Sequence, residues 1–171
     1  ALSSANAVLV TGPGSIWSNS SSLHIGASGS GNELVVSNGA RVDCNFGDLG
    51  QNASSGSNRV LVTGAGSAWR ISGNFSLGGF GGGNRLVISN GASLNNSFGR
   101  IGFSSSNNEA LVTDPGSTWS NQSSFFVGVS GSGNRLVVSN GGLVMSSSAV
   151  IIGEASTNNR VVVDGGTLRA S

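Results

Sequence analysis

The chain is poor in the residues on which many protein functions depend. Its 171 residues include no tyrosine, one histidine, one cysteine and two prolines, and 9% are charged. The single cysteine, Cys44, excludes an internal disulfide, and we interpret it as a small core residue. Eight arginines without any lysine give a net charge of +1. That charge is too small for the basic surface that binds nucleic acid or anionic membranes.

Long apolar segments and clustered catalytic groups are also missing. The longest apolar runs are four or five residues, too short to insert into a membrane, and none has a helical period. No two carboxylates make an evident acid/base pair, and His24 alternates outward between Leu23 and Ile25. The glycine-rich stretch 78–83 lacks the aspartate of a calcium-binding repeat. We therefore expect no enzymatic activity, no cofactor and no metal site.

What the chain does have is one phrase repeated seven times. Each unit runs from an asparagine through a short aliphatic stretch, a Ser/Thr and Gly turn, and two further apolar segments. The units start at Asn6, Asn32, Asn58, Asn84, Asn108, Asn134 and Asn159, 24 to 26 residues apart. The first, third and fifth units contain a turn ending in G-S-x-W, and the second, fourth and sixth contain S-N-G, so the full repeat is two units long.

This repeat predicts an all-β, right-handed parallel β-solenoid of about six to seven turns. Each unit is long enough for about three short strands and too small to bury its own apolar face, which stacking at about 4.8 Å per turn does bury. Parallel strands joined by crossovers favour the right hand. The unbroken repeat indicates a single domain over residues 1–171. Because the chain begins at Ala1 and the last unit is partial, we expect excision from something larger.

Stacked units turn equivalent residues into ladders. We expect the asparagines at the unit starts, Asn32, Asn58, Asn84, Asn108, Asn134 and Asn159 among them, to bond side chain to side chain between turns. Trp17, Trp69 and Trp119 alternate with aliphatic residues in a second ladder. A third contains the hydroxyl residues that start with Thr11 and Ser37. Gly26 and its equivalents form a fourth, at a bend that needs positive φ. A charged column should place Glu33 beside Arg59, and Glu109 between Arg85 and Arg135.

One column does not fit a simple inside and outside alternation. It contains Leu9, Val35, Leu61, Val87, Leu111, Val137 and Val162. If the residues that follow these point inward, the column is an outward aliphatic stripe and a candidate assembly surface. The alternative is that a bend at the strand end turns both neighbours inward.

The phrases V-L-V-T-G-x-G-S-x-W, L-x-I-G and S-G-S-G-N-x-L-V-V-S-N-G-A resemble the Gly/Ser/Asn-rich repeats of bacterial autotransporter-type and other large, adhesin-like surface proteins. The resemblance covers residues 6–169 and implies an extracellular or cell-surface location in a bacterium. Such proteins also have a secretion signal and often an outer-membrane barrel, which these 171 residues do not include. The export route therefore stays open.

Three functions follow as hypotheses. The first is a non-enzymatic structural rod, a surface stalk or adhesin passenger segment. The second is a self-assembling filament subunit that associates end to end through uncapped ends or laterally through the stripe. The third is a solenoid that binds cell-surface or matrix glycans, for which outward Phe126, Phe80 and Phe103 are the only indication.

Overall fold

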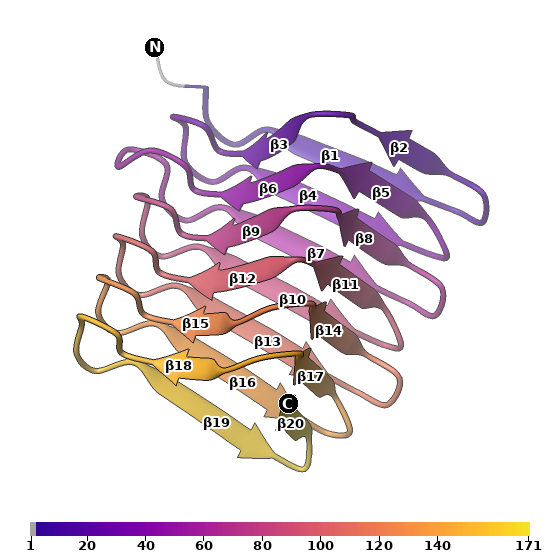
Figure 1. The fold of residues 1–171 in the computed structure, drawn as a ribbon. Helices are drawn as coiled ribbons and strands as arrows, with labels where there is room; N and C mark the ends of the chain where they lie inside the picture. Colours follow the sequence, from indigo (N-terminus) through magenta and orange to yellow (C-terminus); the bar gives the residue numbers. More distant parts are fainter. Residues whose placement is uncertain (1–2) are drawn as a thin grey trace.

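The computed structural model describes residues 3–171, and within them it contains strands and turns but no helix. The chain winds through stacked coils; the first six contribute one strand to each of three faces, and the last contributes β19 and β20 to two of them (Figure 1). The expected all-β parallel solenoid of about seven turns is therefore confirmed. Ala1 and Leu2, the first residues of the expected domain, lie outside the described residues.

The three faces are parallel sheets, which we call sheets A, B and C. Sheet A consists of β1 (Ala7–Thr11), β4 (Glu33–Ser37), β7 (Arg59–Thr63), β10 (Arg85–Ser89), β13 (Glu109–Thr113), β16 (Arg135–Ser139) and β19 (Arg160–Asp164). Sheet B consists of β2 (Ile16–Ser18), β5 (Arg41–Cys44), β8 (Ala68–Ile71), β11 (Ser93–Asn96), β14 (Thr118–Asn121), β17 (Leu143–Ser146) and β20 (Thr167–Ala170). Sheet C consists of β3 (Ser22–Ile25), β6 (Phe46–Leu49), β9 (Asn74–Leu77), β12 (Phe98–Ile101), β15 (Phe125–Val127) and β18 (Val150–Ile152).

The register follows the sequence repeat without a slip in sheet A. Val36 lies beside Val10 on one side and beside Val62 on the other. Because side chains alternate across a strand, this register sends every second residue inward. Val36, Val62 and Ile88 are fully buried, and they join the side chains of the other two sheets in a single core that runs the length of the stack.

Aromatic rings fill the middle of that core. Trp69, Phe75, Trp119 and Phe125 are all fully buried. Successive rings meet edge to face, with centroids 5.2 Å apart for Trp69 and Phe75, 5.8 Å for Phe75 and Trp119, and 4.8 Å for Trp119 and Phe125. Such geometry stabilises aromatic pairs by about 0.5 to 1.5 kcal/mol beyond the area they bury. The core is therefore specifically packed in the centre of the stack.

Candidate functional surfaces

The asparagines at the unit starts form a continuous buried spine. From Asn32 to Asn134, the Oδ1 of each asparagine accepts two hydrogen bonds from the asparagine one turn before it, from the backbone N–H and from Nδ2. At Asn84 these two bonds, both from Asn58, measure 2.9 and 3.0 Å. The same bonds join each successive pair of asparagines from Asn6 to Asn134. At the last step only the backbone N–H of Asn134 donates to Asn159 Oδ1, at 2.9 Å.

The glycines of the glycine ladder lie against the asparagine side chains of this spine. Gly78 has a φ of 78°, and a Cβ there would overlap the amide of Asn108 and the hydroxyl of Ser105. Gly26, Gly50 and Gly102 face Asn58, Asn84 and Asn134 in the same way. Glycine is therefore required at this position for two reasons: the backbone is left-handed, and the asparagine approaches too closely for a Cβ.

The tryptophan ladder has the expected aliphatic neighbours. Trp69 pairs with Val42 and with Leu94, and Trp119 with Leu94 and with Val144. Trp17, in the first turn, is only half-buried. The two buried indoles donate to partners that sequence reasoning missed. Trp69 Nε1 lies 3.4 Å from Cys44 Sγ, and Trp119 Nε1 lies 2.7 Å from Asn96 Oδ1.

Cys44 is a buried free cysteine, as expected for a core residue. Burial raises the pKa of its thiol, although the hydrogen bond from Trp69 acts in the opposite direction. A raised pKa keeps the thiol protonated and unreactive at neutral pH.

Asn96 is also buried, and its Nδ2 donates to Asn121 Oδ1 at 2.7 Å. Asn96 and Asn121 occupy equivalent positions in two consecutive units, so the repeat could have predicted that they form a pair.

The aliphatic column of sheet A does point outward. In β4 the neighbours Leu34 and Val36 are buried at 1% and 0% exposure while Val35 between them is half-buried. Leu61, Leu111 and Val162 are likewise half-buried. The stripe is nevertheless less exposed than its composition suggests, because Val87 and Val137 are only 8% exposed and Leu9 alone is largely uncovered, at 63%.

Two polar columns border the stripe. On one side Arg59 Nη1 lies 2.7 Å from Glu33, and Glu109 bonds both Arg85 Nε at 3.2 Å and Arg135 Nη1 at 2.8 Å. The expected charge pairing is therefore confirmed. On the other side the hydroxyls pair within each two-turn repeat, as in the 3.0 Å bond from Ser37 to Thr11. Equivalent bonds join Ser89 to Thr63 and Ser139 to Thr113.

The two ends of the described residues expose apolar side chains. Val8, Leu9 and Ile16 are 42%, 63% and 54% exposed in the first turn, and Ile152 and Val163 are 50% and 49% exposed at the other end. Beside the first turn an open cavity of about 410 Å³ reaches the interior side chains of Trp17, Leu23 and Leu34. A further solenoid turn stacked on either end would bury Val8, Ile152 and Val163, whose equivalents Leu34, Val127 and Val138 are buried inside the stack.

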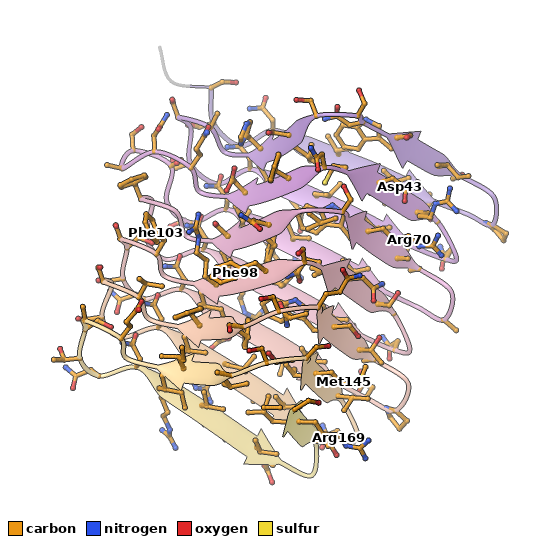
Figure 2. All side chains as sticks on the ribbon, in the orientation of Figure 1. Asp43, Arg70, Phe98, Phe103, Met145 and Arg169 are labelled. Atoms are coloured by element: carbon orange, nitrogen blue, oxygen red, sulfur yellow. The ribbon has the colours of Figure 1, made fainter. Side chains whose placement is uncertain are left out.

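The outer face of sheet C contains an aromatic band. Phe98 and Phe126 lie with their ring centroids 5.2 Å apart. Phe80 and Phe103, in the loops that follow this sheet, meet edge to face at 6.0 Å. Between these pairs the Arg100 guanidinium carbon lies 4.2 Å from the centroid of Phe103, and its Nε donates to Ser76 at 2.7 Å. Figure 2 labels Phe98 and Phe103 on this face.

His24 begins the central outward column of sheet C. As expected it points outward, where Asp48, Ser76, Arg100 and Phe126 occupy the equivalent positions in successive turns. Its Nδ1 lies 3.0 Å from Asp48 Oδ2, a contact that sequence reasoning missed. His24 and Asp48 occupy equivalent positions one turn apart, so aligning the units could have predicted this contact.

The corner between sheets B and C contains an open groove of about 760 Å³. Asp43, Asn45, Arg70, Ser72, Asn95 and Gln122 line it, together with neighbours from the same turns. Figure 2 shows Asp43 and Arg70 on adjacent strands at the side of sheet B. Most of the residues that line the groove are polar.

Residues 3–171 contain no group of three or more His, Cys, Asp or Glu side chains that could hold a metal ion. Nor does that part of the chain form any helix with the length and hydropathy of a membrane span. The fold and these surfaces define a parallel β-solenoid repeat protein. Comparison with protein-family models, with curated proteins and with solved structures finds no match.

Proposed function

We propose that this chain is a non-enzymatic structural rod, a stalk or passenger segment displayed on a bacterial surface in the manner of an adhesin. The observation that carries the proposal is the asparagine spine. It repeats the same buried contacts from turn to turn, and no buried side-chain nitrogen or oxygen of the described residues lacks a hydrogen-bond partner. A stack tied together at each step resists bending and proteolysis, because opening one turn breaks several buried bonds together.

The arrangement of charges supports the same function. Asp43 accepts from Arg41 Nε at 2.8 Å, and Glu33 and Glu109 also pair with arginines. These carboxylates pair with cations and not with one another, as expected of groups that maintain solubility and register. An acid/base pair of a glycosidase instead needs two carboxylates facing one site.

Immunogold electron microscopy of intact cells that make the protein tests this function. Antibodies against the folded chain should label the outside of the envelope, and mild protease treatment should release fragments in which residues 6–169 stay intact. Label that appears only after the cells are broken would overturn the proposal, as would rapid cleavage within the strands.

As a second candidate, we propose that the rod associates end to end with further copies of itself. Two observations favour it, the exposed apolar side chains at both ends and the polarity of the spine. Among the described residues, Asn6 Oδ1 accepts no hydrogen bond and the Asn159 backbone N–H donates none. The acceptor at one end matches the donor at the other, and such a heterologous contact does not close, so it generates filaments.

Electron microscopy of the purified chain tests the second candidate. End-to-end stacking predicts filaments that disappear in the double variant Val8→Glu and Val163→Glu, because both residues occupy inward positions of sheet A and the charges would be buried at the junction. The matched variant Leu61→Glu and Leu111→Glu places its charges mid-stripe and should leave filaments intact while separating any lateral bundles. Single short rods at all concentrations would exclude this candidate and leave the first unaffected.

A further inference from the structure

We propose that the groove between sheets B and C binds an extended, uncharged β-linked polysaccharide. This function goes beyond that of a rod and would make the chain itself adhesive. It rests on the shape of the groove, on unengaged polar side chains within it, and on two phenylalanines beside it.

The groove has the shape of a site for a chain and not for a compact ligand. Asn19, Asn45, Ser72, Asn95 and Gln122 line it from five consecutive turns. Four strand spacings correspond to roughly 19 Å along the solenoid axis. Its volume of about 760 Å³ is within the range of small-molecule sites, but it is spread along this length. Several sugar units of an extended chain fill such a space.

Three polar side chains in the groove are free to bind a ligand. Within residues 3–171, the side chains of Arg70, Asn95 and Gln122 make no hydrogen bond to another protein group. By contrast, the Asn19 amide is engaged by Ser22 O and by the Ser21 N–H. Amides both donate and accept, so they match the hydroxyl groups of sugars.

The charge of the groove selects an uncharged ligand. Among its lining residues, Asp43 is already paired with Arg41, which leaves the single charge of Arg70 unpaired. Phosphate or sulfate groups require a cluster of arginines or lysines, which the lining residues lack. Backbone recognition of a peptide is also disfavoured, because the corner amides are already bonded to the preceding turn, as in the 3.0 Å bond from Ser72 N to Cys44 O.

Phe46 and Phe98 provide the apolar surfaces on which sugar rings stack. Phe46 is 42% exposed, and its ring covers the backbone of Gly73 in the next turn, where a Cβ would lie only 2.8 Å from Cε1. Phe98 follows in the same column, with Asn74 between them. The two rings are thus two strand spacings apart, roughly 9.6 Å. That spacing is close to the length of two sugars in an extended β-linked chain.

Titration calorimetry with tetramers of β-1,4-linked glucose and of N-acetylglucosamine tests the proposal, with cellulose and chitin pull-downs as a second assay. At least one polymer should bind. Phe46→Ala and Phe98→Ala should each weaken binding at least tenfold, and so should Arg70→Gln. Phe80→Ala, a phenylalanine that is 55% exposed on the other side of sheet C, and Arg169→Gln, in the last turn of sheet B, should bind like the unchanged chain.

Circular dichroism melting of each variant separates loss of binding from loss of fold. The proposal is overturned if neither oligosaccharide nor polymer binds the folded chain, or if folded Phe46→Ala and Phe98→Ala bind normally. It is also overturned if a peptide occupies the groove and the sugars do not. None of these results would bear on the function of the chain as a rod.

Discussion

At the residue scale, Asn84 connects two turns through a single oxygen. Its Oδ1 accepts both the backbone N–H and the Nδ2 of Asn58, and Asn84 is 1% exposed. Asn84→Ala would leave these buried donors without an acceptor, so we expect a loss of about 2 to 4 kcal/mol in the free energy of unfolding. Urea denaturation measures it. Asn6→Ala, at the exposed start of the spine, should cost less than about 1 kcal/mol, and equal losses would contradict the importance of burial.

The glycines of the third turn separate backbone strain from steric overlap. Gly66 and Gly78 have nearly the same φ, 80° and 78°, but a Cβ at Gly66 meets nothing closer than Gly39 Cα at 3.7 Å. Gly66→Ala should therefore cost only the strain of a left-handed alanine, about 1 kcal/mol. Gly78→Ala adds overlap with Asn108, worth about 1 to 3 kcal/mol more. If the two variants show equal denaturation midpoints, the proposed interlock of glycine and asparagine is wrong.

At the scale of elements, Glu109 links β13 to both of its neighbours. Partial burial raises the pKa of Glu109, but hydrogen bonds from Arg135 and Arg85 on β16 and β10 outweigh it, so the pKa is lowered overall. A lowered folded-state pKa stabilises the fold above the unfolded-state value, and this contribution is lost as the pH falls through the folded-state pKa.

We therefore expect Glu109→Gln to reduce stability at neutral pH by less than about 1 kcal/mol, since the pairs are partly exposed. The difference from the unchanged chain should shrink to nothing in acid, as denaturation at several pH values would show. Glu154→Gln, an exposed carboxylate that forms no ion pair within residues 3–171, is the control and should match the unchanged chain. A difference for Glu109→Gln that persists in acid would mean that packing, not charge, is responsible.

At the scale of the whole molecule, stability should vary along the stack. Interior turns contact a neighbour on both sides, whereas the first and last turns of the described residues contact only one, so local opening costs least there. Hydrogen exchange should be slowest in β7, β10 and β13 and fastest in β1 and β19. Exchange that is uniform along dilute single rods would contradict this gradient. In end-to-end filaments the terminal strands should become better protected from hydrogen exchange. Filaments whose terminal strands exchange as fast as in single rods would argue against stacked ends.

Much of the architecture was predictable because a solenoid converts sequence period into spatial neighbours. A residue and its equivalent one unit later must lie side by side, so the asparagine, tryptophan and charge ladders could be read from the repeat. The outward direction of Val35 could not, because it depends on whether the strand bends before or after it. Burial of Leu34 and Val36 on either side resolved that point.

The sequence alone therefore determined the fold class, the register and the residues that share a ladder, since all three depend only on period. Tertiary structure decided the contacts that cross between ladders. Gly26 meets Asn58, and Trp119 meets Asn96, at offsets that no single period connects. The same holds for the groove beside Phe46, because its shape arises where two sheets meet at a corner. The angle of that corner is set by packing in the core, which the repeat by itself does not specify.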